Sequence, residues 1–274
     1  MKENAYTTLI DTMPDNILSA TDISVGYHIK KTEKVVLSHL NLSLERGKLT
    51  CLFGANGTGK STLLRTLSGV QPALGGEIML YGNKELNSLS RIELAKIISI
   101  VNTDYTAAGA LSVEEVVSLG RYPYTGFFGV LSREDKKITD NAISSVGLTH
   151  LRNRHIATLS DGERQKAMIA RALAQDTPVI ILDEPTSFLD AASRIETLSL
   201  LKSLTRKYNK AVLVSTHDIS QSLAQADNLW LLTSDKNLIC GKVSDIIAET
   251  GTLDRLFQGR NVTFSKERLD FVPN

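Results

Sequence analysis

The chain has 274 residues, of which 42% are hydrophobic and 22% charged, an ordinary composition for a globular protein. Its 31 basic and 30 acidic residues leave a formal net charge of +1, which argues against a dedicated nucleic-acid or anionic-lipid binder. Without a secretory signal, a run of roughly 18 apolar residues or a metal-type spacing of its two cysteines, Cys51 and Cys240, we expect a cytosolic chain.

The first part of the chain predicts strands around one helix. Residues 17–27 and 35–44 alternate between apolar and polar side chains, as half-buried strands do, and 49–53 form a short apolar strand. A glycine-rich turn follows and opens into a helix over 60–68. A second turn rich in glycine then precedes another strand, over 77–80.

The second part of the chain changes its periodicity twice. From about 111 to 175 the apolar positions recur with helical spacing, which indicates a helical lobe. Afterwards strand, helix and strand alternate, with strands at 179–182 and 211–214 and a helix that begins after Asp190. Such alternation predicts a parallel sheet in an α/β core.

One glycine-rich loop carries a specific chemical signature. Residues 54–61 read GANGTGKS, which matches the phosphate-binding pattern G-x-x-x-x-G-K-[ST] between a predicted strand and a predicted helix. The glycines let consecutive backbone N–H groups face a phosphate at the positive end of the helix. Lys60 then supplies a charge to the β- and γ-phosphates, and the Ser61 hydroxyl ligates Mg²⁺. The residues expected to bind the nucleotide here are Gly54, Asn56, Gly57, Thr58, Gly59, Lys60, Ser61 and Thr62.

Two acidic residues follow the apolar strand at 179–182. Asp183 is placed to hold Mg²⁺, as in other phosphate-loop enzymes. Glu184, one residue farther on, can act as general base toward an attacking water. The alternative is a buried strand that ends in a solvated acidic turn, and the phosphate loop upstream favours the catalytic interpretation.

Residues 159–163 read LSDGE and permit two interpretations. As local structure, Ser160 and Glu163 form the capping box that begins many helices. A serine and a glycine at a helix start also form a site for an anion, which would involve Ser160 and Gly162. The position of the segment shortly before the acidic strand end favours the second interpretation.

Taken in order, these motifs resemble the ATP-binding cassette (ABC) family. The resemblance covers nearly the whole chain and includes SFLD at 187–190 and THD at 216–218. In that family the LSGGQ-like segment of one subunit closes over the γ-phosphate held by the phosphate loop of the other. The resemblance therefore implies a homodimer, in which Ser160 and Gly162 contact nucleotide bound to the partner.

The resemblance also implies roles for three further residues. Asp190 matches the aspartate that communicates across the dimer, and His217 matches the histidine that contacts the γ-phosphate. Tyr27 matches the aromatic residue that stacks on adenine. Together with Glu184 and Lys60, His217 completes the expected catalytic set.

The fold implied is α/β: a P-loop NTPase core of the ABC ATPase type, with an antiparallel β flank and an inserted helical subdomain. We expect this domain over 17–258, with the helical subdomain at about 111–175, and a carboxy-terminal tail over 259–274.

Two positions depart from the family pattern. Where the family has a glutamine that reaches Mg²⁺ and the attacking water, this chain has Thr103, or alternatively Asn102. Thr103 is the expected metal ligand, but both side chains are shorter than glutamine. Asp161 replaces a glycine of the signature segment, where it either weakens the contact with phosphate or points away from it.

The helical lobe contains an aromatic segment, GRYPYTGFFG at 120–129, in a chain with only 5% aromatic residues. It resembles a segment of the ATPases that serve ferric-siderophore, haem and cobalamin importers. We expect Tyr122, Tyr124, Phe127 and Phe128 to dock the membrane-spanning permease. The alternative is a small hydrophobic core of the lobe.

The function expected from these features is ATP hydrolysis coupled to import, with ATP and Mg²⁺ as cofactors. The partners expected are a second copy of the chain, the permease subunits and, indirectly, a periplasmic or surface binding protein, but no nucleic acid. This places the chain peripherally on the cytoplasmic side of the inner (plasma) membrane. The alternative function is that of an ABC ATPase outside transport, such as one in iron–sulfur assembly.

Overall fold

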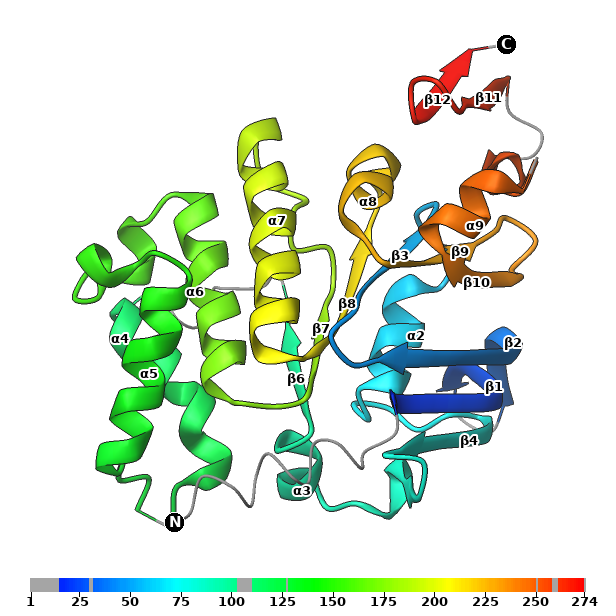
Figure 1. The fold of residues 1–274 in the computed structure, drawn as a ribbon. Helices are drawn as coiled ribbons and strands as arrows, with labels where there is room; N and C mark the ends of the chain where they lie inside the picture. Colours follow the sequence, from blue (N-terminus) through cyan, green and yellow to red (C-terminus); the bar gives the residue numbers. More distant parts are fainter. Residues whose placement is uncertain are drawn as a thin grey trace.

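The structure is a computed structural model that describes residues 15–29, 32–102, 110–126, 128–249, 251–257 and 261–273. Within these ranges the chain forms two β-sheets, a group of helices beside them and a carboxy-terminal hairpin (Figure 1). No helix in the described ranges combines the length and the apolar character needed to cross a bilayer.

The central sheet has six strands in the order β10-β9-β3-β8-β7-β6. Neighbouring strands are parallel, apart from the antiparallel pair β9–β10. Its strands are β3 (Leu49–Gly54), β6 (Ile98–Val101), β7 (Val179–Leu182), β8 (Ala211–Thr216), β9 (Asn228–Leu232) and β10 (Leu238–Lys242). This parallel arrangement confirms the α/β core expected from the alternation of strands and helices.

The second sheet is antiparallel and has the order β2-β1-β4-β5. Its strands are β1 (Asn16–Ile29), β2 (Thr32–Glu45), β4 (Gly75–Leu80) and β5 (Lys84–Glu85). This sheet is the antiparallel flank predicted from the alternating segments near the start of the chain. A separate hairpin of β11 (Val262–Ser265) and β12 (Asp270–Pro273) lies at the carboxy-terminal end (Figure 1).

Most of the α-helices begin where a short polar side chain caps them, except α2 and α9. Serines at 90, 112, 132 and 160 each form a capping box with an acidic residue three positions later, at the start of α3, α4, α5 and α6. The α-helices are α2 (Lys60–Leu67), α3 (Arg91–Ala95), α4 (Val113–Ser118), α5 (Arg133–Ser145), α6 (Asp161–Ala174), α7 (Ala191–Tyr208), α8 (Ile219–Gln225) and α9 (Val243–Ala248). The 3₁₀ turns are η1 (Leu86–Ser88), η3 (Leu119–Tyr124), η4 (Thr149–Leu151), η5 (Ile156–Thr158) and η6 (Leu253–Phe257).

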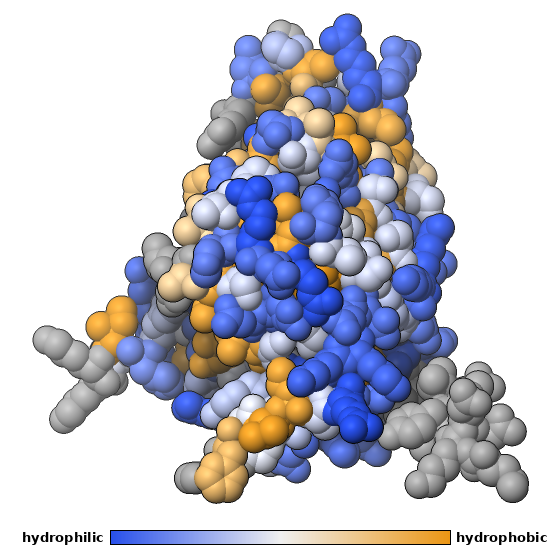
Figure 2. Space-filling model, turned by 90° about the vertical axis from the view of Figure 1, so that its left-hand side faces the viewer, coloured by the Kyte–Doolittle hydropathy of each residue, from blue (hydrophilic) through white to orange (hydrophobic). Residues whose placement is uncertain are grey.

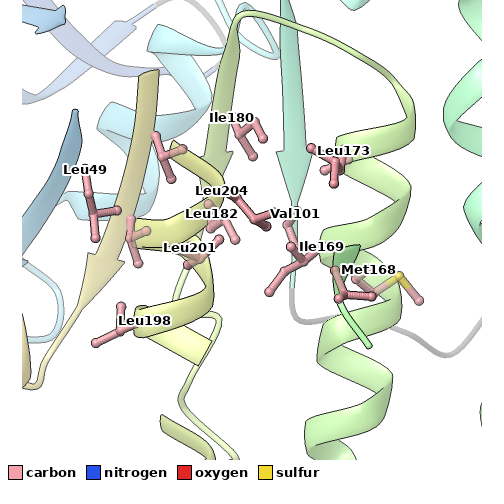
Figure 3. Close-up of a cluster of buried hydrophobic side chains, with 14 of the residues drawn as sticks. Leu49, Val101, Met168, Ile169, Leu173, Ile180, Leu182, Leu198, Leu201 and Leu204 are labelled. Carbon is pink, nitrogen blue, oxygen red and sulfur yellow. The ribbon is translucent and has the colours of Figure 1, made fainter. Parts of the chain in front are cut away.

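Alternate residues of the central strands enter two different cores, which explains why these strands are apolar on both faces. In β7, Ile180 and Leu182 pack into the cluster on the side of α6 and α7, whereas Val179 and Ile181 pack into the cluster between the two sheets. Figure 3 shows the first cluster, in which Leu198 and neighbouring leucines of α7 approach the sheet. The central sheet is therefore held rigidly on both faces.

Helices α4, α5 and α6 pack on one another beside the central sheet (Figure 1). They lie within the segment 111–175 predicted to be a helical insertion; its treatment as a separate subdomain stays a prediction. Because β3, β6, β7 and β8 run parallel, their carboxyl ends meet at one edge of the sheet. The residues that follow these strands are therefore brought together there.

Candidate functional site

The loop between β3 and α2 has the backbone conformation of a phosphate cradle. Gly57 and Gly59 have φ of 78° and 114°, which side-chain-bearing residues rarely adopt. Gly59 also lies so close to β2 that an added Cβ would meet Val36 Cγ1 at 2.8 Å. The Thr58 hydroxyl donates to the Ala55 carbonyl oxygen at 2.8 Å and so closes the loop on itself. The loop leads directly into the amino terminus of α2, where free N–H groups favour an anion.

The Lys60 side chain crosses beneath this loop. It is only 5% exposed, and its Nζ donates to the carbonyl oxygens of Gly54 at 2.9 Å and Ala55 at 3.3 Å. Lys60 Nζ also lies 3.5 Å from Glu184 Oε1, which joins the phosphate loop to the acidic end of β7. The lysine is thus held at a fixed position between the loop and a carboxylate.

The two carboxylates at the end of β7 lie on a sharp change in backbone direction. The Asp183 N–H donates to the Val101 carbonyl oxygen at 3.1 Å, which extends the β6–β7 pairing by one residue. Glu184 then has φ of 47°, in the left-handed region that costs a non-glycine residue free energy. The strand therefore ends abruptly, and both acidic side chains are half-buried at its end.

An open cleft of about 560 Å³ brings most of the predicted nucleotide site together. It is lined by Tyr27, Val36, Asn56, Gly57, Gly59, Lys60, Ser61, Thr62, Asp183 and Glu184. Val36 was not predicted from the sequence, because an apolar residue in an alternating strand carries no chemical signal. Gly54 and Thr58 lie in the same loop, where Gly54 is buried.

Tyr27 lies at the rim of the cleft, near the end of β1, and is 40% exposed. Its hydroxyl group lies 2.6 Å from Thr62 Oγ1 on α2, and this hydrogen bond fixes the ring beside the phosphate loop. A partly exposed aromatic ring held in this way offers a flat surface on which a base could stack.

His217 follows β8 at the same edge of the sheet as Asp183 and is exposed. Among the described residues, those that line the cleft do not include His217. The structure therefore places it near the site but outside the cleft of its own chain.

Ser160, Gly162 and Asp190 form a second location, away from the lining of this cleft. Ser160 caps α6, and a Cβ added to Gly162 would meet Ser193 Oγ at 3.4 Å, so the starts of α6 and α7 are close together. Asp190 caps α7 and accepts from the Ser193 backbone N–H at 2.8 Å. Hydrogen bonds from that N–H, which has the larger effect, and from the Ser193 hydroxyl hold the pKa of Asp190 below its usual range.

The capping box expected at Ser160 is present. Glu163 Oε2 accepts from the Ser160 backbone N–H at 2.9 Å and from its hydroxyl, also at 2.9 Å. Both hydrogen bonds lower the pKa of Glu163, and the one from the backbone has the larger effect. Asp161 turns toward Arg164, with 3.0 Å between Oδ1 and Nη1, so its charge is paired within the same helix turn. Ser160 thus caps the helix and is at the same time exposed to solvent.

Two predicted residues, Thr103 and Phe127, lie outside the described residues. Asn102, the alternative to Thr103, is exposed directly after β6 and lines a second hollow with Asp183 and Arg65.

The aromatic segment is built around a buried arginine that the sequence did not single out. Arg121 Nε donates to Asp135 Oδ1 at 2.8 Å, and its Nη1 donates to the Ala174 carbonyl oxygen at 2.8 Å. Its guanidinium lies 4.0 Å from the centre of the Tyr124 ring, which is 38% exposed. Tyr122 and Phe128, by contrast, are 74% and 88% exposed. The segment therefore has one anchored tyrosine and at least two aromatic side chains that face outward.

Comparison with known proteins gives consistent matches. A profile of the family described as ABC transporter matches residues 37–187. The iron(3+)-hydroxamate import ATP-binding protein FhuC of Bacillus subtilis is 38% identical over 76% of this chain and 75% of its own length. The ferric enterobactin transport ATP-binding protein FepC of Escherichia coli is 34% identical over 84% of this chain and 83% of its own.

Solved structures agree with these relatives. A chain from an ABC transporter assigned to the metal-chelate type, in an inward-facing conformation, aligns with a TM-score of 0.77 at 31% identity. That alignment covers 94% of this chain and 98% of the other. The bacterial ABC transporter cassette MJ0796, which was solved as a dimer, aligns with a TM-score of 0.68 at 27% identity, over 82% of this chain and 98% of its own.

Proposed function

This chain belongs to the ABC transporter family as an ATP-binding, ATP-hydrolysing subunit, and we propose that it drives an importer of iron–siderophore complexes, haem or cobalamin. The observation that carries the proposal is the cleft in which the phosphate loop faces two carboxylates, with Lys60 3.5 Å from Glu184. Relatives named for siderophore import favour this branch over an iron–sulfur assembly ATPase.

The cleft suits a nucleoside triphosphate from end to end. The N–H groups of the phosphate loop and the Lys60 ammonium group would hold the β- and γ-phosphates, at the amino terminus of α2. The Tyr27 ring, held by its hydrogen bond to Thr62, would stack on the adenine at the rim of the cleft. A base and a triphosphate would thus be bound in one cleft.

Ser61 and Asp183 fit a Mg²⁺ ion that travels with the nucleotide. A hydroxyl and a carboxylate are the hard oxygen donors that Mg²⁺ prefers, and both line the cleft. The other ligands of such an ion would come from phosphate and water. Bound there, Mg²⁺ would neutralise charge on the phosphate oxygens.

Glu184 would act as the general base of hydrolysis. Its carboxylate takes a proton from water as the water oxygen attacks the γ-phosphorus, and the bond to the β–γ bridging oxygen breaks to leave ADP and phosphate. To do this, the carboxylate has to leave the Lys60 ammonium group, which then turns to the phosphates. The Lys60–Glu184 ion pair therefore competes with ATP binding. His217, which follows β8, would contact the γ-phosphate.

A second copy of the chain would complete the site. Ser160, Gly162 and Asp190 gather at the starts of α6 and α7, away from the cleft lining of their own chain. In a two-fold symmetric pair, each copy can present this surface to the nucleotide of the other. The dimeric cassette MJ0796 supports such a pairing for this fold. The Asp161–Arg164 pair would keep the Asp161 charge away from the phosphate.

The permease would dock on the helical side of the molecule. Figure 2 shows that side, where hydrophobic side chains protrude near the lower edge of a largely hydrophilic surface. The exposed aromatic residues Tyr122 and Phe128 and the 75% exposed Val130 belong to the segment after α4. Aromatic side chains give a large contact area at low entropic cost. We place the subunit peripherally on the cytoplasmic side of the membrane, bound through this segment.

Reconstitution with the permease tests the proposal. A candidate permease and its binding protein are reconstituted with this chain in proteoliposomes, and ATP hydrolysis is measured with ferric siderophore, haem or cobalamin. We expect one of the three cargoes to stimulate hydrolysis, and Lys60→Ala to abolish the stimulated rate. ATP hydrolysis that no cargo of these classes changes, with a permease that imports something else, would contradict the importer branch.

A further inference from the structure

Ser215 is a fully buried serine in the middle of the acidic site. It lies in β8, which runs between β3, the strand that precedes the phosphate loop, and β7. The parallel register of β7 and β8 pairs Leu182 with Val214, so the next residues of the two strands, Asp183 and Ser215, lie across from each other. Ser215 and Thr216 are the two polar residues that end β8, after four apolar ones.

The Ser215 hydroxyl connects both acidic residues. It donates to Asp183 Oδ1 at 2.6 Å and accepts from the Glu184 backbone N–H at 2.8 Å. Since a hydroxyl has one proton, and a backbone N–H can only donate, the directions of both hydrogen bonds are fixed. One oxygen atom thus sets the position of the Asp183 carboxylate and the orientation of the Glu184 peptide at the same time.

The second hydrogen bond stabilises an unfavourable backbone conformation. Glu184 has φ of 47°, and its backbone is held on one side by Ser215 and on the other by the Ser187 N–H, which donates to the Glu184 carbonyl oxygen at 3.2 Å. This conformation directs the Glu184 side chain toward Lys60 rather than along the strand. Loss of the Ser215 contact would let the peptide relax and would move the carboxylate.

We propose that Ser215 is a positioning residue for ATP hydrolysis, which fixes the carboxylate that holds the metal and the carboxylate that activates water in one geometry. This inference rests on the proposed roles of Asp183 and Glu184. Ser215 itself lies behind both residues and is not among those that line the cleft in the described part of the chain. It would act through Asp183 and Glu184 and would not touch ATP.

A matched buried serine separates this role from ordinary strand stability. Ser99 in β6 is also fully buried, and its hydroxyl accepts from Thr177 Oγ1 at 3.0 Å and donates to the Val179 carbonyl oxygen at 3.4 Å. It lies in the same sheet but contacts neither acidic residue through these bonds. Ser99→Ala therefore controls for the loss of a buried strand hydroxyl.

The test compares Ser215→Ala, Ser215→Thr and Ser99→Ala in the full chain. We expect Ser215→Ala to lower kcat about tenfold, as for loss of a hydrogen bond to a charged group, with KM for ATP within about twofold. The Mg²⁺ concentration for half-maximal rate should rise several-fold, whereas ATP binding measured in EDTA stays unchanged. Ser215→Thr, which keeps the hydroxyl, should recover the kcat and the Mg²⁺ response, and Ser99→Ala should leave both near wild type.

Two results would overturn the inference. One is a Ser215→Ala protein with wild-type melting temperature, kcat and Mg²⁺ response. The other is an equal loss of activity and melting temperature in Ser215→Ala and Ser99→Ala, which would make Ser215 merely structural. If the added methyl group of Ser215→Thr crowds its neighbours and lowers the melting temperature, the Mg²⁺ response of Ser215→Ala alone decides between a positioning and a structural role. Failure of the proposed function shows separately, as a near wild-type rate in Glu184→Gln.

Discussion

Replacing Glu184 by glutamine changes the site in a way whose size follows from the structure. The amide keeps the volume and the hydrogen-bonding capacity of the side chain but loses its charge and its basicity. Two effects are expected: the attacking water loses its proton acceptor, and Lys60 loses the carboxylate 3.5 Å from its Nζ. The first lowers the rate, and the second favours ATP.

The two effects differ greatly in size. Loss of a general base lowers kcat by about 10²–10⁴-fold. At 3.5 Å and an effective dielectric constant of about 20, the Lys60–Glu184 attraction is about 5 kcal/mol before desolvation. Because the Glu184 side chain is 32% exposed, solvent screening leaves a net value of about 1 kcal/mol. Release of Lys60 should therefore tighten ATP binding about fivefold.

The assay combines turnover, affinity and association. Glu184→Gln should bind ATP at least as tightly as wild type, hydrolyse it at least about a hundredfold more slowly, and elute as a dimer with ATP and Mg²⁺ in size-exclusion chromatography. Glu134→Gln, an exposed acidic residue in the first turn of α5, is the matched control and should behave as wild type. A Glu184→Gln protein that keeps near wild-type turnover, or binds ATP more weakly, would refute the reasoning.

Three other predictions concern the edge of the site and the helical side. From side-chain reach alone, Thr103→Ala should reduce the ATPase rate far less than Ser61→Ala; equal losses in a rate assay would give the threonine the role of the missing glutamine. Tyr122→Ala and Phe128→Ala, which remove exposed rings, should abolish transport while melting temperature and soluble ATPase activity stay normal; an early melt would instead make these rings part of a core. Hydrogen bonds from the Ser132 hydroxyl, which has the larger effect, and from Arg121 lower the pKa of Asp135 in the folded chain. The ionised carboxylate therefore stabilises the fold above its unfolded pKa of about 3.9, and this stabilisation is lost as the pH falls from there through the lower folded pKa. The gap in melting temperature between wild type and Asp135→Asn should thus narrow as the pH falls through this range, and a gap independent of pH would contradict the ion pair.

In the docking experiment, Tyr124 is a poorer choice than its exposed neighbours. Its ring packs against the Arg121 guanidinium at 4.0 Å, so Tyr124→Ala should lower stability as well as binding. Phe127→Ala remains a useful companion to Phe128→Ala, since the sequence places both in the same segment.

Local patterns were sufficient for most of the fold. The apolar strand at 179–182 was predicted with its observed bounds, because a fully buried strand flanked by turn residues has an unambiguous pattern. By contrast, β6 and α8 were not predicted, since a serine interrupts the short apolar run of β6 and the seven residues of α8 carry too few periodic positions. The order of strands in the central sheet depends on contacts between distant segments, which local periodicity does not encode.

The candidate site, like the fold, was predicted from the sequence only where its residues are close together along the chain. The phosphate loop and the acidic strand end were predicted because their residues are contiguous in sequence. Lys60 and Glu184 lie 124 positions apart, and Ser215 lies 32 positions from Asp183 and 31 from Glu184. No local sequence pattern beside these residues indicates the contacts. Arg121 was missed for a related reason, since its partners Asp135 and the Ala174 carbonyl lie on two other helices.

Mixing two inactive variants tests most directly the claim that two copies of this chain build one catalytic site. Lys60→Ala lacks the phosphate lysine, and Ser160→Arg blocks the surface offered to the partner, so each alone should be inactive. In an equal mixture, half of the dimers pair the two variants, and each such dimer has one intact site out of two. We expect an ATPase rate of roughly a quarter of wild type per chain in the mixture. A mixture no more active than the two variants measured separately would contradict it.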